Sequence, residues 1–185
     1  MNLKQLIRTT TFLAIAFSVI ILSSCSKDDD GGTDNSNQLF LKVYLGSEQI
    51  NIYEEDADAI EGSFGTIPFP DFTYYGGGIN VQTPSGTNDS KMFIIQIYDD
   101  NPINTSTYSG YQEIQPGLYY GVQFLFSTGT NFYSSDENNT TSTVTITSIN
   151  NNRINGTFSG TVINLMNGET VNITNGEFSV ENATN

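Results

Sequence analysis

From Gln38 onward, apolar and polar residues alternate along the chain with a period of two. This period places successive side chains on opposite faces of a β-strand, so it predicts strands rather than helices. The first segment has apolar residues at four alternate positions, Leu39, Leu41, Val43 and Leu45. Gly46-Ser47 then supplies a turn, and Ile50 and Ile52 resume the alternation. We expect a β-hairpin here.

The middle of the chain contains further strand patterns. Ile79, Val81 and Thr83 form a short strand after Gly76-Gly77-Gly78, a run that we interpret as a turn or bulge. Residues 92–98 are nearly all apolar, which predicts a central strand covered on both faces. One apolar face of a long strand comprises Leu118, Tyr120, Val122, Phe124 and Phe126, after the turn signal Pro116-Gly117. Residues 54–72 are irregular, and we expect a long loop or a short helical turn.

The last third of the chain shows the clearest alternation. Val144 and Ile146 alternate with threonines, and the turn signals 150–152 and Asn167-Gly168 follow. Between these turns one face carries Ile154, Phe158 and Val162, with Gly156 and Gly160 at the intervening positions of that face. Val171 and Ile173 are odd-numbered, whereas Phe178 and Val180 are even-numbered. We place the required change of phase at Asn175-Gly176, as a bulge or tight bend with positive φ.

These patterns amount to about nine short strands and no amphipathic helix after residue 25. Short strands with frequent turn signals are typical of an all-β fold, and we predict an antiparallel β-sandwich or barrel. Strand count alone does not separate these two architectures. Residues 38–185 are expected to form a single β domain, because this length suffices for one hydrophobic core.

The first 24 residues have the layout of a secretory signal peptide. Lys4 and Arg8 supply a positive region, an apolar run follows from Phe12 to Leu22, and small residues lead to Cys25. A retained transmembrane helix is the alternative, but such a helix needs about 20 apolar residues. The sequence Leu22-Ser23-Ser24-Cys25 resembles the lipobox of bacterial lipoproteins. This resemblance implies cleavage before Cys25, lipidation of its thiol and attachment to a membrane.

Residues 25–37 comprise Cys25 and a polar linker without apolar side chains, which is typical of a flexible tether. Lys27, Asp28, Asp29 and Asp30 follow the cysteine closely. They resemble the lysine-plus-acidic export signal of surface lipoproteins in Bacteroidota-type bacteria. This resemblance implies an outer-membrane protein that faces the cell exterior. A plain solvated tether is the alternative.

Three segments near the C-terminus also form a recognisable pattern. They are Val144-Thr145-Ile146-Thr147, Gly156-Thr157-Phe158-Ser159-Gly160 and Ile173-Thr174-Asn175-Gly176-Glu177-Phe178. The pattern is similar to that of uncharacterised small β-rich lipoproteins of Bacteroidota-type bacteria. The similarity implies an all-β fold and a surface or outer-membrane anchor, and it carries no catalytic residues.

Charge and composition restrict the chemistry of the protein. The chain has 6 basic and 20 acidic residues, and removing residues 1–24 takes away only Lys4 and Arg8, so the net charge changes from −14 to −16. Such a chain repels nucleic acid and anionic lipid headgroups. The chain has no histidine, and lipidation would consume its only cysteine, Cys25. These absences exclude histidine-dependent nucleophiles and zinc sites built from His and Cys. Carboxylate pairs, as in glycoside hydrolases, survive this exclusion, but most acidic residues lie in polar loops, so we expect no enzymatic activity.

Oxygen-rich side chains leave calcium as the plausible metal. Asp99, Asp100 and Asn101 end a strand and form the first candidate site. Glu54, Glu55, Asp56 and Asp58 form the second. Neither cluster has the spacing of a known calcium loop, so turn residues and surface charge are the competing interpretation.

Tyrosines are the candidate binding residues. Tyr74, Tyr75, Tyr108 and Tyr111 lie in or beside loop-rich segments, as do Tyr119 and Tyr133. Exposed tyrosine rings stack on sugars or anchor a protein partner, whereas strand tyrosines commonly pack in the sheet. The leading hypothesis is a non-enzymatic binding or envelope-structural β domain on a lipid anchor. The alternatives are a lipocalin-like carrier of small ligands and a glycan-binding accessory subunit of a surface uptake complex.

Overall fold

The computed structural model describes residues 38–68, 72–86, 88–115, 118–135 and 141–184. The expected signal peptide, Cys25 and the acidic tether with Lys27 and Asp28 to Asp30 lie outside these residues, as does the turn signal Pro116-Gly117. The described residues are almost entirely β-structure, which confirms the all-β prediction. One short 3₁₀ turn, η1, spans Glu54–Asp56. The expectation of about nine strands was too low, because twelve are present in the described residues.

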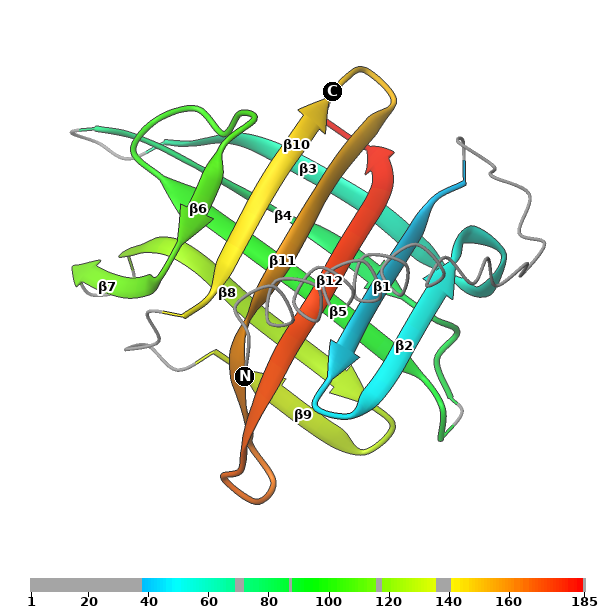
Figure 1. The fold of residues 1–185 in the computed structure, drawn as a ribbon. Coiled ribbons are helices and arrows are strands. Elements are labelled where there is room, and N and C mark those ends of the chain that lie inside the picture. The colour runs from blue at the N-terminus through cyan, green and yellow to red at the C-terminus, as the bar shows by residue number, and fades with distance from the viewer. Residues whose placement is uncertain (1–37, 69–71, 87, 116–117, 136–140, 185) are drawn as a thin grey trace, which may run out of the picture. The chain divides into compact units, whose positions relative to one another are not determined.

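The strands follow one another along the chain with short connections (Figure 1). Their bounds are β1 Phe40–Leu45, β2 Glu48–Tyr53, β3 Ala59–Pro68, β4 Thr73–Gln82, β5 Lys91–Asp99, β6 Thr107–Ser109, β7 Tyr111–Gln115, β8 Leu118–Thr128, β9 Asn131–Ser134, β10 Thr143–Ile149, β11 Arg153–Asn164 and β12 Thr170–Asn182.

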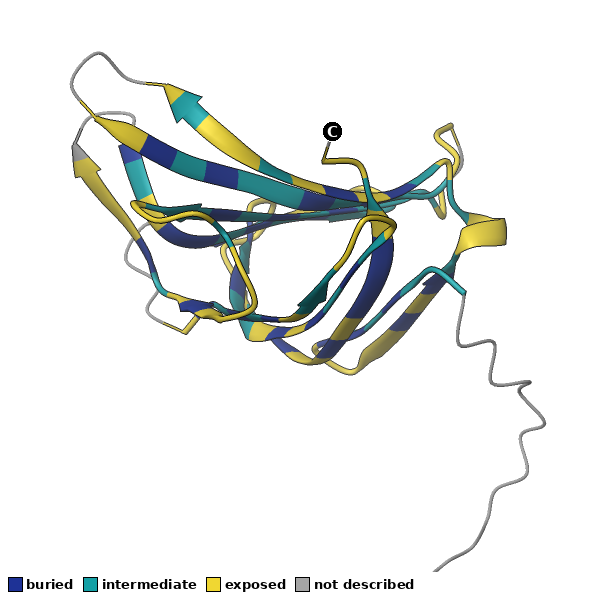
Figure 2. Ribbon diagram, turned by 90° about the horizontal axis from the view of Figure 1, so that it is seen from above, coloured by how far each residue is buried: buried dark blue, intermediate teal, exposed yellow. Residues whose placement is uncertain are grey.

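Hydrogen bonding joins the twelve strands of the described residues into one mixed sheet, rather than the purely antiparallel arrangement that we predicted, and this sheet folds into two layers that face each other (Figure 2). The front layer has the order β2-β1-β12-β11-β10-β6, and the back layer has the order β3-β4-β5-β8-β9, with β7 also paired to β8. Two short pairings join the layers, a parallel one between β12 and β3 and an antiparallel one between β9 and β11. Strands of the two layers cross one another in Figure 1, and the core lies between them.

The predicted N-terminal hairpin is confirmed. Strands β1 and β2 pair antiparallel, with Leu41 opposite Ile52 and Val43 opposite Ile50. All four of these side chains are buried. Gly46 adopts a φ of 63°, the left-handed conformation that the turn requires. Alternation therefore fixed both the face and the register of this element.

Two expectations for residues 54–83 were wrong. The 3₁₀ turn is present, but Ala59–Pro68 forms strand β3 along the full length of β4 instead of a loop. Gly76-Gly77-Gly78 lies inside β4 and is neither a turn nor a separate bulge. A Cβ atom at Gly77 would collide with the backbone of Ser63 on β3, and one at Gly78 would lie 2.7 Å from the carbonyl oxygen of Ile95 on β5. The glycines therefore allow close approach of neighbouring backbones.

Strand β5 occupies the central position that we predicted, between β4 and β8. Its two faces nevertheless differ. Phe93, Ile95 and Ile97 are fully buried in the core. Ile94 and Gln96 point to the other face and are only half-buried. The expectation that both faces are covered was therefore wrong, because the second layer packs against only one side of this strand.

The apolar face expected along β8 breaks near its start. Val122, Phe124 and Phe126 are buried in the core, but the Tyr120 side chain is 39% exposed. Gly121 has a φ of 100°, and a Cβ there would collide with the carbonyl oxygen of Gly110. This positive φ changes the phase of the strand, so the residues before Gly121 do not continue the core face.

The C-terminal strands confirm the predicted phase change. Asn175 has a φ of 51°, and the register of β12 shifts at this position against both β1 and β11. Phe158 lies directly opposite Gly176, and Phe178 lies directly opposite Gly156. A Cβ at Gly176 would lie 2.7 Å from the Phe158 ring, and one at Gly156 would lie 2.5 Å from the Phe178 ring. Each ring thus covers the glycine across from it.

The space between the layers is filled by side chains. Five phenylalanine rings form a continuous chain of contacts across it, Phe93, Phe126, Phe124, Phe158 and Phe178, with centroid separations from 4.6 to 6.3 Å. Aliphatic side chains from both layers surround these rings. A carrier of the lipocalin type needs an enclosed cavity. These rings occupy the centre of the space in which such a cavity would lie.

Replacing Phe158 with alanine should lower the free energy of unfolding by about 3–5 kcal/mol, because it leaves a cavity and uncovers Gly176. Urea denaturation measures this change. Phe132→Ala is the matched control, since its ring is 50% exposed and its replacement should change stability by at most about 0.5 kcal/mol. A loss below about 1 kcal/mol for Phe158→Ala would contradict the packing.

The bulge makes a separate prediction at Asn175. Asn175→Val should lower stability by about 1–2 kcal/mol, because a β-branched residue is strained at positive φ. Asn175→Gly should leave stability unchanged or slightly higher, because glycine adopts this conformation without strain. Equal stability of the two variants in urea denaturation would show that the positive φ at this position is not required.

Candidate functional site

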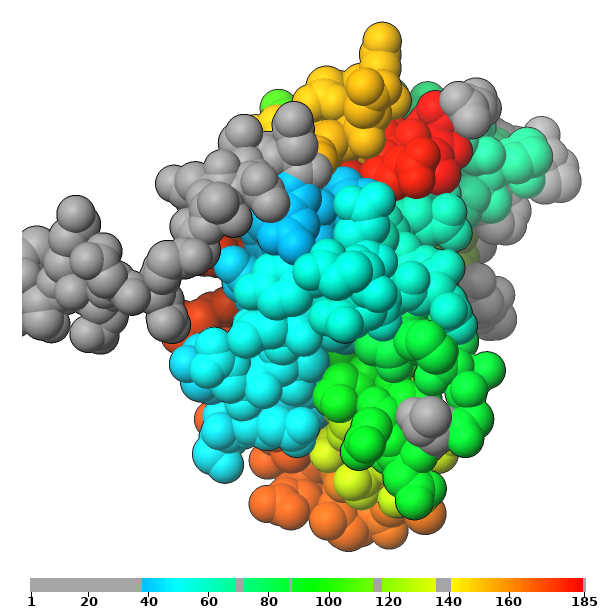
Figure 3. Space-filling model, turned by 90° about the vertical axis from the view of Figure 1, so that its right-hand side faces the viewer, coloured from blue at the N-terminus to red at the C-terminus, as the bar shows by residue number. Residues whose placement is uncertain are grey.

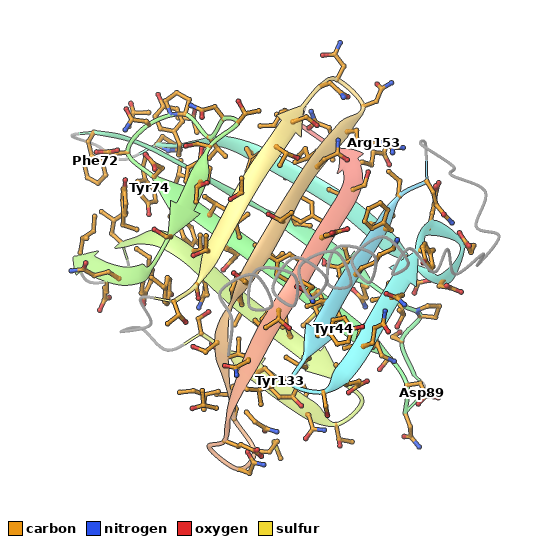
Figure 4. The ribbon with its side chains drawn as sticks, in the orientation of Figure 1. Tyr44, Phe72, Tyr74, Asp89, Tyr133 and Arg153 are labelled. Carbon is orange, nitrogen blue, oxygen red and sulfur yellow. The ribbon has the colours of Figure 1, made fainter. Side chains whose placement is uncertain are left out.

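The first calcium candidate and several of the candidate binding tyrosines lie together at one end of the back layer. Asp99 ends β5, Tyr74 and Tyr75 lie near the start of β4, and Tyr111 begins β7. Tyr75 lies directly opposite Asp99 across the β4–β5 pair. Figure 4 shows Tyr74 and Phe72 at this end of the domain. Long-range strand pairing therefore places the candidate carboxylate beside the candidate tyrosines.

Two stacked pairs of rings form a tyrosine cluster here, comprising Tyr74, Tyr98, Tyr111 and Tyr119. The Tyr74 and Tyr98 rings are 6.0 Å apart with an interplanar angle of 9°, and the Tyr111 and Tyr119 rings are 5.1 Å apart with an angle of 14°. Glycine makes room for them, since Gly76 and Gly121 both lie opposite Tyr98 on the strands that flank β5. Tyr74 and Tyr111 are buried, but they do not belong to the main core.

Most of the candidate ligand-binding tyrosines do not present exposed faces. Tyr74, Tyr108 and Tyr111 are 4%, 8% and 6% exposed, respectively. Tyr75 is half-buried on β4. Stacking on a sugar or a partner requires an accessible ring, so the three buried residues fit the alternative interpretation, in which strand tyrosines pack in the sheet. Their burial follows from packing against one another and, for Tyr108, against the core.

Asp99 is held in place by a local network of hydrogen bonds. Its Oδ1 accepts a hydrogen bond of 2.8 Å from the backbone N–H of Asn101, which forms an Asx turn after β5. Its Oδ2 accepts a hydrogen bond of 3.2 Å from the Tyr120 hydroxyl. The carboxylate is thereby oriented from both sides, and Tyr120 is drawn toward the end of β5.

In the structure, the first calcium candidate is a set of turn residues that hydrogen-bond to one another, and the second is a group of surface charges. The Asn101 side-chain amide donates to the Oδ1 atoms of Asp99 and Asp100, at 3.3 and 2.5 Å. The second cluster lies in and beside η1, on the face shown in cyan in Figure 3, and its four residues Glu54, Glu55, Asp56 and Asp58 are exposed. Within the described residues, no group of three or more Asp, Glu or Cys side chains is arranged to hold a metal ion.

A small cleft opens beside Asp99, between β8 and β6. We call it the Asp99–Tyr120 cleft. It has a volume of about 170 Å³ and is lined by Asp99, the segment Ser106–Ser109, Tyr120 and Gly121. Ser106, Thr107 and Ser109 are exposed and present hydroxyl groups, whereas Tyr108 is buried. The cleft thus combines a carboxylate, several hydroxyls and an accessible aromatic ring.

The wall of this cleft is fixed by Tyr108. Its hydroxyl accepts a hydrogen bond of 2.8 Å from the backbone N–H of Asn104 and donates one of 3.1 Å to the carbonyl oxygen of the same residue. The backbone N–H of Ile146 donates to the carbonyl oxygen of Ser106, at 2.9 Å. The Thr107 hydroxyl lies 2.9 Å from that of Thr145 on β10. These bonds tie the β5–β6 connection to the front layer.

Burial and neighbouring groups raise the pKa values of three tyrosines at this end. Burial raises the pKa of Tyr74 most strongly, and the nearby Tyr98 and Asp99 raise it further. Burial, and then Tyr119, raise the pKa of Tyr98. The pKa of Tyr120 rises through burial and through the Asp99 charge and hydrogen bond. These hydroxyls are therefore protonated at neutral pH, so Tyr120 donates to Asp99.

Larger depressions lie elsewhere on the domain, including a polar one of about 270 Å³ lined by Glu48, Asp89 and Lys91, among others. Two more are larger still. One, of about 440 Å³, runs over the outer face of β10, β11 and β12 and is lined by Thr143, Thr145, Thr157, Ser159, Asn175 and Glu177, among others. All of these residues except Thr143 belong to the three segments of the C-terminal pattern. The other, of about 470 Å³, is lined by Phe64, Ile103, Ile149, Asn151, Asn182 and Thr184. Neither combines a carboxylate with an exposed aromatic ring.

Sequence reasoning found Asp99 but missed Tyr120 and the Ser106–Ser109 wall. Tyr120 was placed on the buried face of β8, because the alternation from Leu118 to Phe126 appeared unbroken. The neighbouring Gly121 was the one local signal of a change in phase. No local signal marks Ser106 or Ser109, since their position depends on β6 pairing with β10.

Comparisons with known proteins add no further identification. No family model, curated protein or solved structure matches the chain. Among the residues that the structure describes, no helix is long and apolar enough to cross a membrane. The chemistry of the cleft is therefore the basis for its proposed role.

The raised pKa of Tyr74 predicts a loss of stability at alkaline pH. Above about pH 10 the unfolded chain ionises this tyrosine whereas the folded chain retains its proton, so the free energy of unfolding falls as pH rises. Tyr74→Phe should make this fall shallower, because phenylalanine carries no proton to lose. Urea denaturation from neutral to alkaline pH measures the slope. Identical slopes for the two proteins would contradict the prediction.

Proposed function

We propose that the chain is a non-enzymatic binding protein, anchored by lipid on Cys25 to the outer membrane and displayed on the cell exterior. The observation that carries the proposal is the order of features in the chain. A lipobox-like sequence, an acidic tether and a β domain follow one another, and the first strand begins at Phe40, soon after Cys25. This order is typical of a folded domain held at a membrane surface by a flexible linker.

The position of Gln38, the first described residue, supports display of the cleft. The carbonyl oxygen of Gln38 accepts a hydrogen bond of 3.3 Å from Arg153, and the Gln38 amide donates to Glu55. These bonds fix Gln38 beside β1 and η1. Figure 1 shows β1 beginning on the right of the domain, whereas β6 and β7 lie on the left. The β6 strand, which lines the Asp99–Tyr120 cleft, therefore lies across the domain from Gln38.

The interior and the composition support binding at the surface rather than carriage or catalysis. The phenylalanine-rich core occupies the space between the layers, whereas the Asp99–Tyr120 cleft is open to solvent. The chain has no histidine, and Asp99 is engaged by Tyr120 and Asn101. An oriented carboxylate of this kind can accept a charge-assisted hydrogen bond from a ligand.

Lipidation is tested by replacing Cys25 with serine. Cells that incorporate labelled palmitate should label the wild-type protein and should not label Cys25→Ser, because the chain has no other thiol. The variant should also move from the membrane fraction to the soluble fraction. Equal labelling of both proteins would contradict the anchor. A membrane-bound variant would instead support a retained apolar helix.

Orientation is tested by adding protease to intact cells. The wild-type protein should be cleaved, and a variant with Asp28, Asp29 and Asp30 replaced by alanine should be protected, because it lacks the acidic signal. Asp34→Ala, in the same tether, is the matched control and should be cleaved like wild type. If wild type is protected in intact cells but cleaved after lysis, the domain faces the periplasm and surface display is wrong.

A further inference from the structure

We propose that the Asp99–Tyr120 cleft binds a single neutral sugar ring. This inference rests on the proposed function in one respect, because a displayed domain meets ligands from outside the cell. It goes further by assigning a chemical class of ligand and the residues that recognise it. The cleft brings together a carboxylate acceptor, hydroxyl groups and an aromatic face.

The polar groups of the cleft match the hydroxyls of a sugar. Each sugar hydroxyl both donates and accepts hydrogen bonds. The Asp99 carboxylate accepts from such a hydroxyl, and bonds to a charged acceptor are about twice as strong as bonds between neutral groups. Ser106, Thr107 and Ser109 line the opposite side and serve as donors or acceptors, because their hydroxyls rotate.

Tyr120 supplies the apolar part of recognition. Its side chain is 39% exposed, and its hydroxyl is directed to Asp99 by the 3.2 Å hydrogen bond. This bond holds the ring at the edge of the cleft, where its face is available to the C–H groups of a sugar ring. The same hydroxyl can accept a hydrogen bond from the ligand, because its own proton is donated to Asp99.

The cleft is organised before a ligand arrives. Asp99 is fixed by Asn101 and Tyr120, and the connection that carries Ser106 is fixed by Tyr108 and Ile146. Binding therefore orders few side chains, which reduces the entropic penalty of association. A polar ligand otherwise gains little at a site that is open to water.

The size and charge of the cleft restrict the ligand further. Its volume of about 170 Å³ equals that of about six water molecules, which suits one ring. Sites for drug-sized ligands are larger, at about 300–1,000 Å³. Asp99 and the net charge of −14 of the whole chain repel anions. We therefore expect neutral hexoses or N-acetylhexosamines to bind and uronic acids to be rejected.

The test is a titration of the isotope-labelled full chain, purified in detergent, followed by amide NMR. The probes are D-glucose, D-galactose, D-mannose, N-acetyl-D-glucosamine and D-glucuronate. At least one neutral sugar should shift the amide signals of residues 99, 106–109 and 120–121, and D-glucuronate should not. Asp99→Asn and Tyr120→Ala should each weaken binding by about tenfold or more. Phe132→Ala changes another exposed aromatic residue, on β9 opposite the far end of β8, and this variant should bind like wild type.

Three outcomes would overturn the proposal. They are no shift with any neutral sugar, shifts confined to residues outside the cleft, or unchanged affinity in both Asp99→Asn and Tyr120→Ala. Unperturbed amide spectra of these variants outside the cleft show that they are folded, so a loss of binding is not a loss of structure. A negative sugar titration does not contradict the proposed surface display, because protease treatment of intact cells tests display alone.

Discussion

The front layer depends on two phenylalanine rings that each cover a glycine on the neighbouring strand. Phe158 lies over Gly176 and Phe178 lies over Gly156, so the two pairs are reciprocal across β11 and β12. A larger residue at either glycine would displace the ring opposite it. The rings in turn join the chain of phenylalanine contacts that reaches β5 and β8 in the back layer. The placing of each ring over a glycine thus links the pairing of β11 with β12 to the packing between the two layers.

Glycine also determines where the domain departs from regular alternation, and these departures create the cleft. Gly121 changes the phase of β8 and turns Tyr120 away from the core. The same glycine leaves space next to Tyr98 and Tyr111, where the tyrosine cluster packs. The cleft therefore borders a rigid aromatic support rather than a loop alone, which keeps Asp99 and Tyr120 in a fixed relation.

Sequence reasoning succeeded where the signal was local and failed where it was not. The β1–β2 hairpin and the bulge at Asn175 were predictable, because alternation and a change from odd to even positions mark them directly. Strand β3 was missed because its inward residues include Gly62, which carries no hydropathy signal. The glycines of β4 were misread for the same reason, since their role is set by the backbones of β3 and β5. The cleft depends on β6 reaching β10, a pairing between segments far apart in sequence.

The position of β12 has a consequence for how the protein is made. This strand pairs with β1 from the start of the domain, with β11 and with β3, so it is central to the assembly although it follows the other described strands in the chain. The front layer cannot assemble until residue 182 has emerged, and the many contacts between distant segments make such folding slow. A chain cut short before Thr170 would lack the strand that pairs with β1, β3 and β11 together, so these three strands would lose their common partner.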